Sequence, residues 1–129
     1  MSTIVFCEDA AAIRKLIAIS MRSTPHRVLI AEDGAAGLAL IRAERPDLVV
    51  TDLAMPIVDG TQLFDILRAD PQLARIPVVF ISASSQRNLL AAARERRPHA
   101  LLKKPFSPTD LRRTVEAVLS GELVAGIGV

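Results

Sequence analysis

The sequence has no tryptophan, no tyrosine and one cysteine, and only four of its 129 residues are phenylalanine. A single cysteine cannot form a disulfide within the chain, which fits a reducing compartment. Glu8 and Asp9 follow Cys7 directly and disfavour a thiolate, so we expect a small buried residue rather than a reactive thiol. With few rings to stack on bases and a formal net charge of only +2, a nucleic-acid partner is not expected.

Long hydrophobic runs are also missing. The apolar runs reach only about six residues, whereas a helix that spans a bilayer needs about 20. The chain passes from Met1 into an apolar run without the basic segment and cleavage site of a secretion signal. We therefore expect a cytoplasmic protein with no membrane partner, folded as one domain around a single core.

Short apolar runs alternate with helical patterns along the whole chain. Such alternation predicts an α/β fold, in which helices cover both faces of a five-stranded, parallel, doubly wound sheet. The predicted strands are Thr3–Cys7, Arg27–Ala31, Leu48–Thr51, Val78–Ile81 and Ala100–Lys103, and the predicted helices are Ala10–Arg22, Gly34–Glu44, Thr61–Ala69, Asn88–Arg96 and Thr109–Leu119.

Charged and polar side chains stand at the ends of four of these strands. Glu8 and Asp9 follow the first, Asp52 follows the third within VVTDLAMPIVDG, Ser82 follows the fourth, and Lys104 follows the fifth. The carboxyl ends of parallel strands share one edge of a sheet, so these side chains should gather there. Clustered carboxylates need a cation, and an oxygen-only set of ligands suits Mg²⁺. A lysine and a hydroxyl beside them could bind a phosphoryl group.

Four motifs occur in the order found in one known family. They are the acidic pair in VFCEDAAAIRK, then TDLAMPIVDG, the loop RADPQLARIPVVFISAS and the terminal KPFSPTDL. With them the sequence resembles a receiver domain of the two-component response-regulator family, from Thr3 to about Leu119. The resemblance implies a (βα)5 flavodoxin-like fold with strand order 2-1-3-4-5. It also implies a His-Asp phosphorelay protein that accepts a phosphoryl group, rather than an enzyme that acts on separate substrates.

The resemblance assigns the phosphoryl chemistry to three residues. Asp52 would accept the group from a phosphohistidine on a sensor histidine kinase or a phosphotransfer protein. Ser82 would donate a hydrogen bond to a phosphoryl oxygen, and Lys104 would pair first with Asp52 and later with the phosphoryl group. Adjacent strand residues point to opposite faces, so Lys103 should point away from Asp52. The Lys104–Pro105 bond should be cis, as the family usually has it.

The same resemblance assigns a Mg²⁺ site. Asp9 and Asp52 would bind the ion directly, Glu8 would act mainly through water, and the backbone carbonyl of Ala54 would turn toward the ion. Asp59 should belong only to the turn that leads into the next helix.

Two features depart from the family. Leu101 stands where an aromatic reporter is usual, three residues before the lysine, so the change on phosphorylation should lie mainly in the loop after Ser82. Arginines gather around the fourth helix, the fifth strand and the fifth helix, and this face could dock a downstream protein. We assign residues 1–120 to the receiver and 121–129 to an apolar tail, with no output domain expected, so the protein should signal by docking onto a partner or by passing its phosphoryl group onward. The arginines concerned are Arg87, Arg94, Arg96, Arg97, Arg112 and Arg113.

Three other protein classes each require a feature that the sequence lacks. A flavodoxin-like electron carrier needs a phosphate loop where Glu8 and Asp9 stand, and a haloacid-dehalogenase-type phosphatase needs an acid where Ala54 stands. A dinucleotide-binding fold needs a G-x-G-x-x-G motif, which is missing. A degenerate receiver that is not phosphorylated and acts only as an interaction module remains the alternative.

Overall fold

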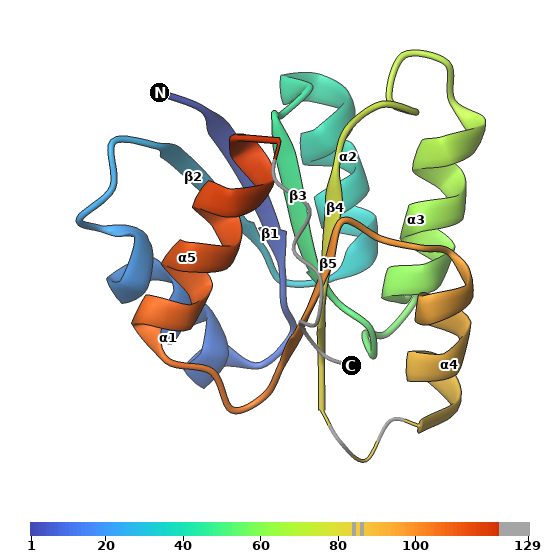
Figure 1. Cartoon of the computed structure of the whole chain (residues 1–129). Coiled ribbons are helices and arrows are strands. Elements are labelled where there is room, and N and C mark those ends of the chain that lie inside the picture. The colour runs from blue at the N-terminus through green and yellow to red at the C-terminus, as the bar shows by residue number, and fades with distance from the viewer. Residues whose placement is uncertain (84, 86, 122–129) are drawn as a thin grey trace.

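The computed structural model describes residues 1–83, 85 and 87–121. Along these residues, five strands alternate with five helices, as the apolar pattern predicts (Figure 1). Predicted and observed boundaries differ by at most one residue, at six helix ends and at the ends of two strands, where Asp52 and Ser82 belong to their strands instead of following them. The elements are β1 (Thr3–Cys7), α1 (Ala11–Met21), β2 (Arg27–Ala31), α2 (Gly34–Glu44), β3 (Leu48–Asp52), α3 (Gly60–Ala69), β4 (Val78–Ser82), α4 (Arg87–Glu95), β5 (Ala100–Lys103) and α5 (Pro108–Leu119).

The strands form one parallel sheet in the order β2-β1-β3-β4-β5, which is the predicted order. Helices α1 and α5 lie on one face of this sheet and α2, α3 and α4 lie on the other (Figure 1). The order reverses next to β1, so β1 and β3 lie side by side and their carboxyl ends meet. In doubly wound sheets this is the usual place for a ligand.

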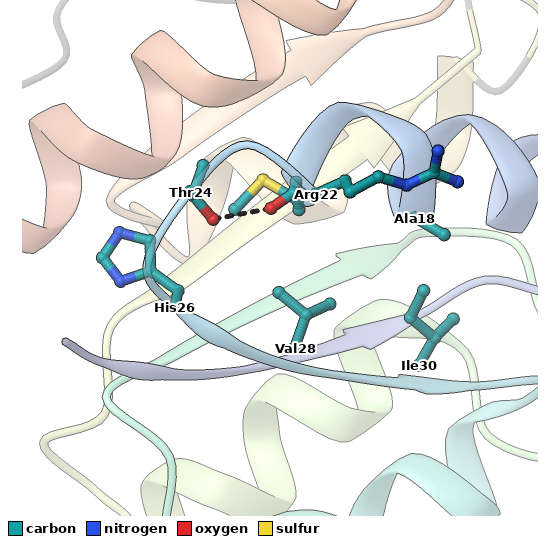
Figure 2. A pocket seen from close by; sticks show the side chains of 7 residues that line it. Ala18, Arg22, Thr24, His26, Val28 and Ile30 are labelled. Carbon is teal, nitrogen blue, oxygen red and sulfur yellow. Dashed lines mark hydrogen bonds between the residues drawn. The ribbon is translucent and has the colours of Figure 1, made fainter.

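Strand β2 forms one edge of the sheet and is only partly covered. Its side chains are mostly half-buried, and a hollow of about 300 Å³ lies between it and α1 (Figure 2). None of the site residues predicted from the sequence lines this hollow. Its lining consists of Ala18, Met21, Arg22, Thr24, His26, Val28 and Ile30.

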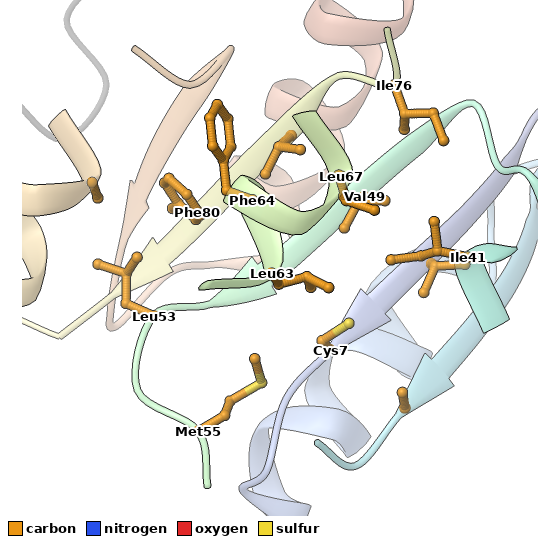
Figure 3. Close-up of a cluster of buried hydrophobic side chains, with 14 of the residues drawn as sticks. Cys7, Ile41, Val49, Leu53, Met55, Leu63, Phe64, Leu67, Ile76 and Phe80 are labelled. Atoms are coloured by element: carbon orange, nitrogen blue, oxygen red, sulfur yellow. The ribbon is translucent and has the colours of Figure 1, made fainter. Parts of the chain in front are cut away.

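Two hydrophobic clusters hold the helices against the sheet. Alternate residues of β1 point to opposite faces, so Val5 and Cys7 join the cluster under α2, α3 and α4, while Ile4 and Phe6 join the cluster under α1 and α5. Figure 3 shows the first cluster, in which the Phe64 and Phe80 rings have centroids 5.7 Å apart. The central strands β3 and β4 are buried along their whole length, which accounts for their continuous apolar pattern.

Among the described residues, side chains cap the starts of three helices. Asp33 accepts a hydrogen bond from the Ala36 backbone at α2. Capping boxes start α3 and α5, built by Asp59 with Gln62 and by Ser107 with Asp110. Each cap satisfies backbone N–H groups that the helix would otherwise leave without partners.

Within the described part of the chain, every helix is too short or too polar to cross a bilayer. The predicted apolar tail falls almost wholly outside that part, because the description ends at Gly121.

Candidate functional site

Backbone hydrogen bonds fix the carboxyl ends of the strands relative to one another. Leu53, directly after β3, donates from its N–H to the Ile81 carbonyl at 3.0 Å, and Lys104, directly after β5, donates to the Ser82 carbonyl at 2.8 Å. The N–H of Glu8 donates to the Ala31 carbonyl at 3.0 Å, which continues the pairing of β1 with β2. The predicted residues at the ends of β1, β3, β4 and β5 therefore meet on a rigid edge.

Lys104 lies between two buried carboxylates. Its Nζ atom is 2.8 Å from Asp52 Oδ2 and 3.0 Å from Glu8 Oε1. Asp52 is 2 % exposed and Glu8 is fully buried, so both carboxylates depend on this ammonium group for charge compensation. Lys103 is exposed, as the alternation of strand residues predicts. The Lys104–Pro105 peptide bond is cis, as the family resemblance implies.

Two buried side-chain oxygens at this edge could form further hydrogen bonds. Asp52 Oδ1 and Ser82 Oγ have no hydrogen-bond partner among the described residues. A buried polar atom without a partner costs free energy, so such atoms in a well-packed structure call for an explanation. Both would gain partners if a cation or an anionic group were bound between the strand ends.

Burial and charge shift the protonation of the site. Burial raises the pKa of Glu8 to about 7, and the Asp52 charge adds to the rise, while the Ala10 N–H and Lys104 oppose it. For Lys104, burial by itself would lower the pKa, but the hydrogen bonds and charges of Asp52 and Glu8 raise it above its usual value. The site thus favours a protonated lysine and holds more carboxylate charge than that lysine can compensate.

The carboxylates of Glu8, Asp9 and Asp52 can share one cation. One oxygen from each lies within 4.8 Å of the others. Glu8 and Asp52 are buried, whereas Asp9 is exposed and leaves the group open to water. Oxygen donors that leave room for water fit Mg²⁺, which keeps several of its own waters when a protein binds it.

The loop between β3 and α3 borders this acidic group. Ala54, Met55 and Pro56 line a hollow of about 390 Å³ together with Asp9, Asp59 and Leu89. Asp59 uses its carboxylate to cap α3, with Oδ1 accepting from the Gln62 N–H at 2.9 Å, so it belongs to the turn, as predicted. The hollow therefore lies beside Asp9, the exposed member of the acidic group.

The sequence matches the family model of the response regulator receiver domain over residues 4–116. The chain is therefore a member of the response-regulator receiver family. It is 31% identical over 121 residues to protein PilH of Pseudomonas aeruginosa, covering 94% of this chain and 100% of PilH.

Longer proteins carry similar receivers. The transcriptional regulatory protein PdtaR of Mycobacterium tuberculosis is 35% identical over 118 residues, which cover 91% of this chain but only 56% of PdtaR. The receiver domain of sensor histidine kinase PA1611 from Pseudomonas aeruginosa, with a magnesium ion coordinated in its active-site cleft, superimposes with a TM-score of 0.84. That match covers 92% of this chain and 98% of the other at 23% identity, so it supports the fold alone.

Arg14 supports the receiver's acidic turn, and sequence reasoning did not assign it this role. Its Nη1 donates to the backbone carbonyls of Glu8 at 3.0 Å and Asp9 at 2.8 Å. These contacts hold the turn between β1 and α1 in place. The available signal was an arginine in the first turn of α1, where the helix dipole disfavours a cation unless it has other partners.

Two of the arginines predicted to form a basic face contact other residues of the receiver. Arg96 forms a two-pronged contact with Asp65 of α3, with Nε 2.8 Å from Oδ1 and Nη2 2.7 Å from Oδ2. Arg112 donates to the Ser20 carbonyl of α1 at 3.1 Å. These two side chains therefore join helices, and a basic docking face formed with the other arginines stays a prediction.

Leu101 is buried in β5, with 7 % of its surface exposed, in the cluster under α2, α3 and α4. It pairs in register with Phe80 of β4. The loop after Ser82, where the change on phosphorylation is expected, includes residues 84 and 86, which are outside the described part of the chain.

Proposed function

We propose that this receiver accepts a phosphoryl group on Asp52 from a phosphohistidine of a sensor histidine kinase or a phosphotransfer protein. The observation that carries the proposal is the Asp52 carboxylate. It is buried at a strand end, with Oδ2 held by Lys104 at 2.8 Å and Oδ1 without a partner in the described residues. An Asp52 oxygen would attack phosphorus while the bond from phosphorus to the imidazole nitrogen breaks, and the electron pair of that bond stays on the imidazole.

Asp9 and Asp52 would hold Mg²⁺ directly, with the Ala54 carbonyl, and Glu8 would act mainly through water. When bound, the ion offsets the charge of the carboxylates and of the phosphoryl group. The donor chemistry of this group supports this assignment, because three carboxylate oxygens within 4.8 Å of one another suit a hard cation.

Lys104 and Ser82 would stabilise the phosphorylated state. The Lys104 ammonium, already 2.8 Å from Asp52, would pair with the phosphoryl oxygens once the carboxylate is esterified. Ser82 Oγ, buried and without a described partner, would donate its hydrogen to one of these oxygens. This contact would draw the start of the loop after β4 toward Asp52.

Acetyl phosphate with Mg²⁺ tests the proposal without a cognate kinase. The wild type should acquire an acid-labile phosphate, seen as a shift in a phosphate-specific gel. Asp52→Asn should abolish the shift, and Asp59→Asn, which changes an acid outside the group, should keep it. Undiminished labelling of Asp52→Asn would refute Asp52 as the acceptor, and an unlabelled wild type would favour the degenerate-receiver alternative.

The output of the receiver would be a protein contact on the face formed by α4, β5 and α5, strengthened by a shift toward the phosphorylated conformation. With Arg96 and Arg112 occupied, exposed arginines such as Arg97 carry its basic character. An acidic partner surface would associate more slowly as salt rises.

Arg97→Glu should reduce capture of a downstream protein by the phosphorylated receiver. Arg45→Glu is the matched control, because Arg45 is also exposed with a positive φ but ends α2, away from this face. Equal capture by both variants would refute the face.

A further inference from the structure

The backbone at Ile57 is strained. The Val58 N–H donates to the Pro56 carbonyl at 2.8 Å across Ile57, whose φ is 72°. A hydrogen bond between residues two apart, with a positive φ at the centre, is the rare and strained form of the γ-turn. A β-branched residue is especially unfavourable there, whereas glycine or asparagine would fit with less strain.

Packing inside the chain does not compensate for this strain. Ile57 is 78 % exposed, one of three large hydrophobic side chains exposed in the described residues, with Met1 and Ile19. An aliphatic side chain in water gains none of the free energy that burial would provide. The isoleucine therefore has no structural advantage over glycine at this position.

The surrounding structure prevents the turn from relaxing. The Gly60 N–H donates to the Leu53 carbonyl at 2.8 Å, which ties the two ends of the loop together. Gly34 of α2 lies directly against Val58, since a Cβ on Gly34 would be only 2.1 Å from the Val58 carbonyl oxygen. The loop is clamped from both sides, and Ile57 is presented outward as a fixed feature.

Ile57 directly follows three residues that line the hollow beside the acidic group. The residues just before it, Ala54 to Pro56, line the hollow of about 390 Å³ that also contains Asp9. Because Asp52 itself is 2 % exposed, a donor must bring its phosphoryl group past the loops at the strand ends, and the loop from Ala54 to Pro56 follows Asp52 most directly. A small donor can enter the hollow alone, but a phosphohistidine arrives on a protein whose surface must cover these loops.

We propose that Ile57 is a docking residue for the protein that donates the phosphoryl group. Its side chain inserts into an apolar spot beside the phosphohistidine, where it gains the burial it lacks in the free chain. This inference rests on the proposed function of Asp52. It makes Ile57 a specificity residue for the donor, with no part in the chemistry at Asp52.

Comparing a small phosphoryl donor with a protein donor distinguishes a loss of docking from a loss of the phosphoryl chemistry at Asp52. Ile57→Gly relieves the strained φ and removes the side chain, so we expect a melting temperature equal to or above that of the wild type. Labelling by acetyl phosphate should stay within about twofold of the wild type. Transfer from an isolated, phosphorylated histidine phosphotransfer domain that labels the wild type should lose roughly fivefold or more in kcat/KM, mostly through KM.

Two further variants complete the test. Ile57→Leu keeps an apolar side chain and should recover most of the transfer rate. Arg45→Gly relieves another positive φ far from the hollow and should leave transfer from both donors unchanged.

The outcomes distinguish the possible failures. Unchanged transfer from the protein donor to Ile57→Gly, with normal labelling by acetyl phosphate, overturns the docking role and leaves the proposed function intact. A wild type that neither donor labels overturns both. If Ile57→Gly instead changes the sedimentation of the phosphorylated chain while transfer is unaffected, the occupant is a second copy and the proposal is wrong.

Discussion

Replacing Lys104 by alanine tests the electrostatics of the site directly. The substitution leaves Glu8 and Asp52 buried without the ammonium that lies 3.0 and 2.8 Å from them. At an effective dielectric constant of about 20, each contact corresponds to about 6 kcal/mol of Coulomb attraction. Most of this is offset by the desolvation of the ammonium in the wild type and by proton uptake on Glu8 in the variant.

We expect a net loss of about 2–3 kcal/mol in the free energy of unfolding at pH 8 without Mg²⁺. This is somewhat less than the 3–5 kcal/mol typical of a broken buried pair, because Asp9 opens the site to water. For a chain of this length it corresponds to a fall in Tm on the order of 10 °C. Urea and thermal unfolding in EDTA would measure the loss.

The loss should depend on pH and on Mg²⁺. Glu8 has a folded-state pKa raised to about 7, and removing Lys104 raises it further. The proton that Glu8 binds below this value replaces part of the missing positive charge, so the deficit should shrink as pH falls from 8 to 6. Millimolar Mg²⁺ should shrink it at pH 8 for the same electrostatic reason.

Lys103→Ala is the matched control. It removes the same charge from the neighbouring, exposed position and should change stability by less than about 0.5 kcal/mol. The reasoning would be refuted if Lys104→Ala were as stable as Lys103→Ala in EDTA. It would also be refuted if the loss of stability in Lys104→Ala depended on neither pH nor Mg²⁺.

Three further predictions concern the acids and the thiol. Asp9→Ala should weaken Mg²⁺ binding at least tenfold in a fluorescence or calorimetric titration. Asp59→Ala should instead cost about 1 kcal/mol of stability through the lost cap. Equal losses of Mg²⁺ affinity in the two variants would contradict the assignment. Since protons and Mg²⁺ compete for Glu8, whose pKa is about 7, Mg²⁺ affinity should fall up to about tenfold from pH 8 to pH 6, and a flat profile would remove Glu8 from the site. Burial raises the pKa of Cys7 to about 12, so a thiol reagent at pH 8 should react roughly a hundredfold faster in urea than with the native protein, and equally fast labelling would mean that Cys7 is not buried.

The sheet and the meeting of its strand ends could be predicted because both depend on local pattern. Apolar runs such as the one before Asp52 mark buried parallel strands, and topology then brings their carboxyl ends to one edge. The family resemblance assigned Lys104 to the site, and alternation then placed Lys103 on the opposite face. The pairing of Lys104 with Asp52 was expected from the resemblance, whereas its contact with Glu8 at 3.0 Å was not predicted.

Contacts between helices could not be predicted in this way. Arg96 and Asp65 are 31 residues apart, and Arg112 and Ser20 are 92 apart. Each of these long side chains could reach solvent or several neighbours, so the choice depends on how the helices pack. The strain at Ile57 was equally invisible, since MPIVDG gives no sign of a turn centred on a β-branched residue.

Leu101 and Arg96 together constrain how phosphorylation could reach the output face. A buried leucine in β5 cannot carry a ring from an inward to an outward position, so α4 and the loop before it are left as the carriers of the change. The Asp65–Arg96 contact ties the carboxyl end of α4 to α3, and Arg96 Nη1 also donates to the Ala92 carbonyl within α4 at 2.7 Å. The amino end, near Ser82, would then move most. Displacement of α4 on phosphorylation should therefore be a tilt about its Arg96 end, largest near Arg87.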